Sequence, residues 1–118
     1  MGNAERTEVI LDTIGDKCAR DILVALARRP RSVKELAGDL DYSRPTIYRR
    51  VNTLQESDMV RERTLVAQDG NHYNVYECNF NGTLVSMEDD GMEVEVYHAE
   101  DLTDRFSELW DELAAGGK

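Results

Sequence analysis

The sequence predicts an α+β fold in which a helical part precedes a part built of β-hairpins. Up to about residue 57, apolar residues recur at helical spacing, whereas the later runs are short, rich in Val, Tyr, Thr and Leu, and separated by turn residues. The 118 residues, of which 41% are hydrophobic, suffice for one modest core. We therefore expect a single domain over residues 1–118, with helices in 6–57, hairpins in 58–98 and a last helix in 100–114.

Four helices are expected in the first part of the chain. Residues 6–14 and 17–29 form the first two, and Pro30 ends the second because the residue before a proline is disfavoured in the α region. Ser32 and Glu35 have the spacing of a capping box, which predicts the start of the third helix.

The fourth helix, expected over residues 43–57, differs from an ordinary surface helix in its charge. Ser43 can cap it, and Pro45 fits its first turn, where a missing N–H group is tolerated. One stripe is apolar and must pack on the preceding helices. The rest has three arginines and several hydroxyl groups, and no acidic residue occurs between positions 43 and 55. The residues expected to face outward are Ser43, Arg44, Thr46, Tyr48, Arg49, Arg50 and Thr53.

A β-hairpin is expected directly after this helix. Residues 60–68 and 72–80 are strand-like and flank Asp69-Gly70-Asn71. An Asp-Gly pair between two such runs is a strong hairpin signal.

A second hairpin and a last helix are expected after the first hairpin. Residues 83–87 and 92–97 form the strands of the second hairpin, and Met92, Val94 and Val96 alternate with glutamates, which predicts one buried face. The last helix has an amphipathic stripe made of Leu102, Phe106, Leu109 and Leu113.

Two short helices joined by a three-residue turn, the second of them basic, and followed by a hairpin form the layout of a winged helix-turn-helix. A helix fits the major groove of DNA, where arginine bonds guanine through two N–H groups. We therefore predict double-stranded DNA as the partner. The residues expected nearest the bases are Arg44, Pro45, Tyr48 and Arg49, whereas Ser43, Thr46 and Arg50 are expected mostly on phosphates. The candidate contacts from the hairpin wing, whose tip has no Arg or Lys, are Arg63, Asn71 and His72.

The net charge of −10 is distributed unevenly along the chain. Residues 17–63 carry a net charge of +4, whereas residues 1–16 carry −3 and residues 64–118 carry −11. The chain also has eleven Arg but only three Lys, and an acidic surface poor in Lys is typical of proteins from salt-loving archaea. We expect adaptation to high salt, with cations from the solvent held between the carboxylates. The alternative is an ordinary acidic bacterial protein.

Residues 32–37 (SVKELA), 43–54 (SRPTIYRRVNTL) and 58–60 (DMV) resemble the ArsR-type winged helix-turn-helix transcriptional regulators, in particular the small haloarchaeal ones. The matching features, over about half the chain, are Leu36-Ala37, Ser43 with Thr46, Leu54 and Val60. The resemblance implies a homodimer that reads a partly palindromic operator. The Cys-x-Cys pair of the metal-sensing members is absent from the second helix of the motif.

The dimer interface is expected on the first and last helices, because a chain of this size has too small a core to bury the apolar faces of both. The alternative is that the last helix packs back on its own domain. The expected interface residues are Val9, Ile10, Ile14, Leu102, Phe106, Leu109, Trp110 and Leu113.

Two other functions remain open from the sequence. The first is a winged-helix module that binds a protein through its acidic half and does not contact DNA. The second is a thiol- or metal-responsive regulator that uses Cys18 and Cys78, although buried small side chains explain both cysteines more simply.

No catalytic or nucleotide-binding motif is present, so we expect neither an enzyme nor a cofactor. Because no apolar run resembles a membrane span or a signal peptide, we also expect no membrane partner and a cytoplasmic location.

Overall fold

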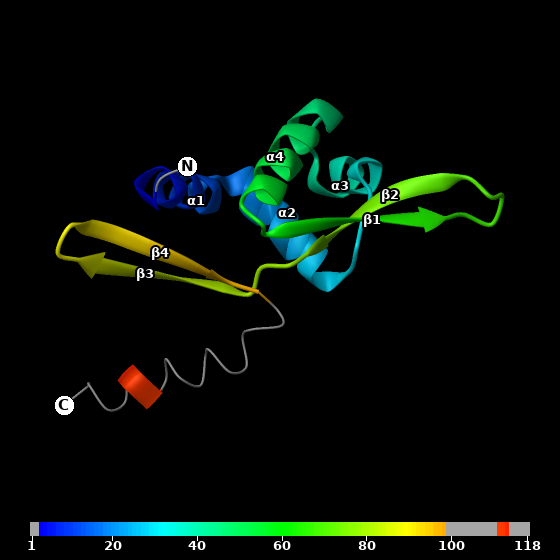
Figure 1. The fold of residues 1–118 in the computed structure, drawn as a ribbon. Helices are drawn as coiled ribbons and strands as arrows, with labels where there is room; N and C mark the ends of the chain where they lie inside the picture. The colour runs from blue at the N-terminus through cyan, green and yellow to red at the C-terminus, as the bar shows by residue number, and fades with distance from the viewer. Residues whose placement is uncertain (1–2, 99–110, 114–118) are drawn as a thin grey trace.

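Four helices are followed by two β-hairpins in the computed structural model, which describes residues 3–98 and 111–113 (Figure 1). The helices are α1 (Asn3–Gly15), α2 (Lys17–Arg28), α3 (Val33–Leu40) and α4 (Arg44–Glu56). The strands are β1 (Val60–Val66), β2 (His72–Cys78), β3 (Gly82–Glu88) and β4 (Gly91–Tyr97). The fold is α+β with the winged helix-turn-helix arrangement, which confirms the expected fold class. Helix α1 begins three residues earlier than expected and includes Gly15.

Side chains at the helix starts fix the helix boundaries. Asp16 caps α2 by accepting the N–H of Ala19. At the start of α3, the Ser32 hydroxyl accepts the N–H of Glu35 while the Glu35 carboxylate accepts the N–H of Ser32, so the predicted capping box is present. The hydrogen bond from the Ser32 backbone is the main cause that lowers the pKa of Glu35. These bonds satisfy N–H groups that have no partner inside the helix.

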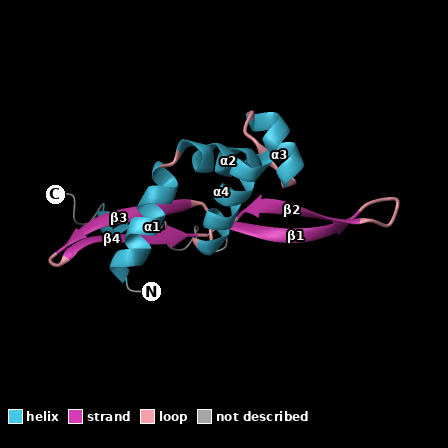
Figure 2. Ribbon diagram, turned by 90° about the horizontal axis from the view of Figure 1, so that it is seen from above, coloured by secondary structure: helices cyan, strands magenta, loops and turns pink. Residues whose placement is uncertain are grey.

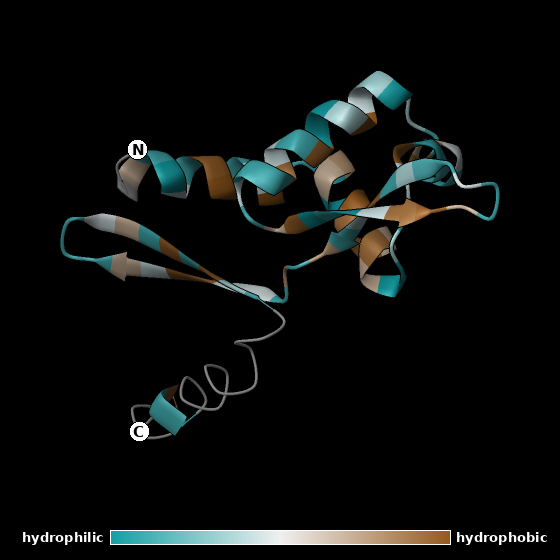
Figure 3. Ribbon diagram, turned by 45° about the vertical axis from the view of Figure 1, so that its right-hand side comes forward, coloured by the Kyte–Doolittle hydropathy of each residue, from teal (hydrophilic) through white to brown (hydrophobic). Residues whose placement is uncertain are grey.

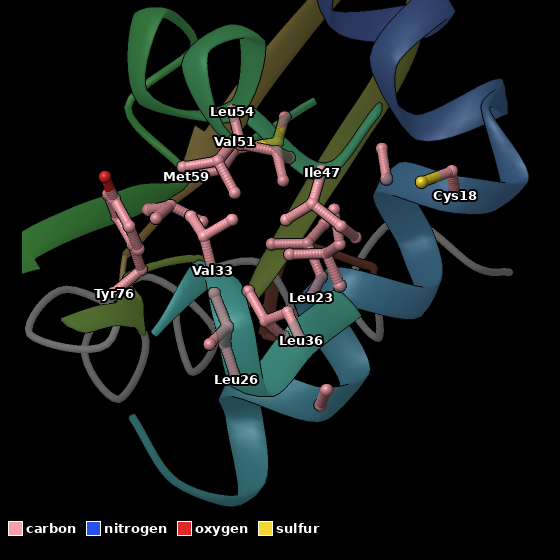
Figure 4. Close-up of a cluster of buried hydrophobic side chains, with 14 of the residues drawn as sticks. Cys18, Leu23, Leu26, Val33, Leu36, Ile47, Val51, Leu54, Met59 and Tyr76 are labelled. Carbon is pink, nitrogen blue, oxygen red and sulfur yellow. The ribbon is translucent and has the colours of Figure 1, made fainter. Parts of the chain in front are cut away.

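The hydrophobic core lies where α2, α3 and α4 meet the base of the first hairpin. Ile47, Val51 and Leu54 of α4 are completely buried and point toward Leu23 and Leu36 (Figure 4). Leu26 and Val33 line the other side of the same cluster, and Met59, Val60 and Tyr76 close it from the hairpin. The apolar stripe of α4 therefore fixes which side of this helix faces solvent.

Strands β1 and β2, with the loop between them, form the wing. The strands pair antiparallel, with Arg61 opposite Glu77 and Thr64 opposite Asn74. Gly70 in the loop has a φ of +85°, which glycine adopts without strain. The backbone of Arg31 exchanges two hydrogen bonds with Tyr76, of 2.8 and 3.1 Å, and so forms an isolated β-bridge at the base of the wing.

The second hairpin, β3 and β4, projects from the helical body away from the wing, and α1 lies across it (Figure 2). Hydrophobic and hydrophilic positions alternate along β4, whereas β3 has two hydrophobic residues in succession, Leu84 and Val85 (Figure 3). Val94 and Val96 are half-buried against the core, but Met92 is exposed, as are Val85 and Met87 on the same face. The prediction of one fully buried face is therefore wrong toward the tip of the hairpin, because α1 packs on β4 and leaves these three side chains uncovered.

In the described residues, no helix has the length and apolar character needed to cross a membrane.

Candidate nucleic-acid interface

Helix α4 presents a basic outward side opposite its buried stripe. Arg44 and Arg49 are exposed, and Tyr48 between them is 51% exposed. Asn52 continues the same surface toward the end of the helix. Within the part of the chain that the structure describes, neither Arg44 nor Arg49 forms an ion pair with a carboxylate. Their guanidinium groups are available to a ligand.

A row of hydroxyl groups lies at the start of α4. The Ser43 hydroxyl accepts the N–H of Thr46 at 3.3 Å and donates to the Thr46 hydroxyl at 2.9 Å. Arg49 donates to the same Thr46 oxygen at 3.4 Å. Because that oxygen already accepts two donors, its own proton points to an acceptor outside the row. The Thr46 hydroxyl and the arginine guanidinium groups at this end of α4 therefore offer hydrogen-bond donors, which suit phosphate oxygens and the acceptor edges of bases.

The turn between α3 and α4 is tied to α2, and this fixes the direction of α4. Asp41 ends α3 in the left-handed conformation, with a φ of 61°, which aspartate tolerates. The Tyr42 hydroxyl then donates to Asp21 at 2.9 Å, and Lys17 donates to the same carboxylate oxygen at 2.8 Å. The hydrogen bonds from Lys17 and Tyr42 lower the pKa of Asp21.

Arg50 differs from the other two arginines of α4 because it forms an ion pair with a carboxylate of the same chain. Its Nε donates to Asp16 at 2.8 Å, and the same oxygen caps α2. This bond joins positions 34 residues apart, so sequence reasoning missed it. Only the terminal nitrogens of Arg50 remain for the phosphate contact predicted from the sequence.

The structure places the predicted wing residues on different parts of the wing. Arg63 pairs with Glu77 at 3.2 Å, and Arg61 binds the other oxygen of the same carboxylate at 3.5 Å. Asn71 at the tip donates its backbone and its side-chain N–H to Asp69, both at 3.0 Å. His72 is exposed.

Residues 14–63, which span α2, α3, α4 and the start of β1, match a family described as a helix-turn-helix domain. A protein of Methanocaldococcus jannaschii named as an uncharacterized HTH-type transcriptional regulator is 34% identical over 57 residues. The match covers 48% of this chain and 59% of the relative, so this chain spans about three-fifths of that protein's length. Both similarities support a helix-turn-helix regulator.

Outside the helix-turn-helix domain, only part of the predicted dimer interface is described. Ile10 is 1% exposed because it is buried in the core of its own chain, so its assignment to an open interface is corrected. Val9 and Ile14 are half-buried, and Leu113 is 66% exposed. The predicted interface residues Leu102, Phe106, Leu109 and Trp110 lie outside the described residues. Sequence reasoning did not single out the exposed face of Val85, Met87 and Met92.

The two cysteines lie in different parts of the fold. Cys18 is buried in α2, and this burial raises the pKa of its thiol, which disfavours the reactive thiolate. Cys78 ends β2 and its Sγ donates to the carbonyl of Phe80 at 3.2 Å. Among residues 3–98 and 111–113, no three His, Cys, Asp or Glu side chains are grouped so as to hold a metal ion.

Proposed function

We propose that this chain is a sequence-specific DNA-binding transcriptional regulator that acts in the cytoplasm. One observation carries the proposal: α4 turns Arg44, Tyr48 and Arg49 outward with no carboxylate between them, in a chain whose net charge is −10. A surface helix without function would mix both charge signs. The similarity of residues 14–63 to a helix-turn-helix family supports the assignment of α4 as the helix that enters the major groove.

The roles of the side chains follow from their positions on α4. Arg44 and Arg49, with Tyr48 and Pro45 beside them, read base edges because they project from the first two turns. The Thr46 hydroxyl donates to a phosphate, and Ser43, whose own proton is donated to Thr46, holds it in that orientation and so helps to set the depth of insertion. The terminal nitrogens of Arg50 add a weaker phosphate contact, and Asn71 and His72 reach the duplex from the wing tip.

Selection from a pool of random duplexes tests this function. We expect the protein to enrich a common sequence and to bind it at least a thousandfold more tightly than an unrelated duplex, which is the lower end of the usual specificity ratio. Equal affinity for the selected and the unrelated duplex would contradict the proposal.

We also propose that the regulator works as a homodimer on a partly palindromic operator. Val85, Met87 and Met92 on the second hairpin and Leu113 are apolar and exposed in the single chain, and a second copy would cover them. The hairpin projects away from the wing, so a dimer formed there leaves α4 free.

If the regulator is a dimer, the enriched sequence should contain an inverted repeat with half-sites about one helical turn apart. Light scattering should give twice the 13.4 kDa of one chain, and a monomer mass at working salt contradicts the dimer.

Adaptation to high salt is the third part of the proposal. An ordinary protein with six phosphate contacts shows a slope of log affinity against log salt of about −5. Here acidic side chains outnumber basic side chains, so cations are retained or taken up between the protein and the DNA. We expect a slope shallower than about −2, or a positive one. A steep negative slope up to molar salt would contradict this adaptation.

A further inference from the structure

The wing has two sides of different chemistry. Because side chains alternate along a strand and directly opposed residues share a side, the register places Thr64 and Asn74 with Glu62 and Tyr76 on one side, here called the inner side. The other side, called the outer side, carries the arginines of β1 and Glu77 of β2. The two sides have different access to α4.

The inner side adjoins the outward surface of α4. At its base, Tyr76 packs in the core with Ile47, Val51 and Leu54 of α4. Burial raises the pKa of Tyr76 most, and the nearby Glu62 and Tyr48 raise it further. Beyond Tyr76, the strands continue the same side outward to Thr64 and Asn74, which are both exposed. A duplex seated on α4 therefore meets the inner side of the wing.

The arginines of the wing are held on the outer side. Both oxygens of Glu77 are bound, one by Arg61 and one by Arg63. For either arginine to reach the inner side, its ion pair with Glu77 would have to break and the strand would have to twist out of its register. The positive charge of the wing is thus partly neutralised and faces away from Tyr48.

The inner side instead offers an unused neutral donor. The Thr64 hydroxyl donates to the Asn74 side-chain oxygen at 3.0 Å, which fixes the amide across the two strands. In the described part of the chain, the Asn74 Nδ2 group has no hydrogen-bond acceptor. An exposed amide held in one orientation, with both N–H groups unused, matches the geometry of a phosphate oxygen.

We infer that the inner side of the wing is a second contact with the DNA backbone, in which the Asn74 amide donates to a phosphate oxygen and Thr64 orients it. This inference rests on the proposed DNA-binding function and names residues that the sequence did not indicate. Glu62, which lies two residue pairs nearer the helices on the same side, repels phosphate and so confines the contact to the outer half of the wing. A neutral donor releases no counterions, so this contact adds affinity without adding salt dependence.

Variants of the wing test this inference in fluorescence-anisotropy titrations on the duplex enriched from the random pool. We expect Asn74→Ala to weaken binding about tenfold, or about 1.4 kcal/mol, with an unchanged salt slope. Asn74→Asp should weaken binding further, because a carboxylate of the same shape faces the phosphate. The matched control is Arg61→Gln on the outer side, for which we expect a change of less than about twofold. Circular dichroism of each variant confirms that the wing has folded.

Two outcomes would overturn the inference. The first is an affinity of Asn74→Ala equal to that of the unaltered protein. The second is a tenfold loss in Arg63→Gln with a salt slope reduced by about one, which would place a charged contact on the outer side. If Arg44→Ala and Arg49→Ala lose binding while Asn74→Ala does not, the inference fails and the proposed function stands. If the unaltered protein enriches no duplex, both fail.

Discussion

Replacing Arg44 or Arg49 with alanine is expected to lower the affinity for the enriched duplex by about tenfold to a hundredfold, as is typical for the loss of a two-bond contact with guanine. Both side chains are exposed and lack a carboxylate partner in the described residues, so their removal leaves the fold intact. Preference for one base pair should relax at the same time, because the contact that distinguishes guanine is lost. Anisotropy titrations on the enriched duplex and on single-base variants measure both effects.

Arg6 provides the control for these two variants. It is an exposed arginine on α1, beside Glu93 and Val94 of the second hairpin, which projects away from the wing. Arg6→Ala removes the same charge and should change the affinity by less than about twofold if charge alone is not decisive. An equal loss in all three variants would mean that only the total charge matters and that α4 reads no bases.

Leu54→Ala is expected to lower the free energy of unfolding by about 2–5 kcal/mol, because it removes a completely buried side chain and leaves a cavity. The total stability of a domain of this size is only about 5–15 kcal/mol, so a large share is lost. Leu54 lies in the stripe that seats α4 on the core, and DNA affinity should fall with it. Urea unfolding at fixed salt, followed by circular dichroism, measures the change.

Val24→Ala in α2 is the matched control for the core variant. Val24 is 56% exposed, so its truncation should change stability by no more than about 0.5 kcal/mol. If Leu54→Ala proves as stable as Val24→Ala, the stripe of α4 does not form the core described here.

The helix-turn-helix part could be predicted from the sequence because its signals are local. The Ser32 and Glu35 capping box, and Ser43 followed by Pro45, mark helix starts within three residues of sequence. The apolar stripe of α4 then fixes which side is outward. The Asp-Gly pair at positions 69 and 70 also located the wing loop correctly.

Features that depend on distant residues could not be predicted in this way. The bond between Arg50 and Asp16 forms only after α2 and α4 have packed together. Met92 has the same strand pattern as Val96, but its burial depends on how far α1 extends over the hairpin. Local patterns do not contain that information.

The ion-paired arginines of the wing were partly predictable from the sequence. Closing the hairpin about the loop at Gly70 places Arg61 opposite Glu77, with Arg63 two positions farther along the same side. The register therefore contained the signal that Arg63 faces away from α4, and it also paired Thr64 with Asn74. The sequence prediction considered charge without the register, and it therefore named Arg63 and not Asn74 as a DNA contact.

The contact between the outward side of α4 and DNA can be tested most directly by nuclear magnetic resonance titration of the labelled protein with the enriched duplex. The largest shift changes are predicted at residues 43–50 and at the side-chain amide of Asn74, with the amides of β3 and β4 near the tip unchanged. Shifts confined to the second hairpin, with α4 unaffected, would show that this molecule uses a different surface and would contradict DNA reading by α4.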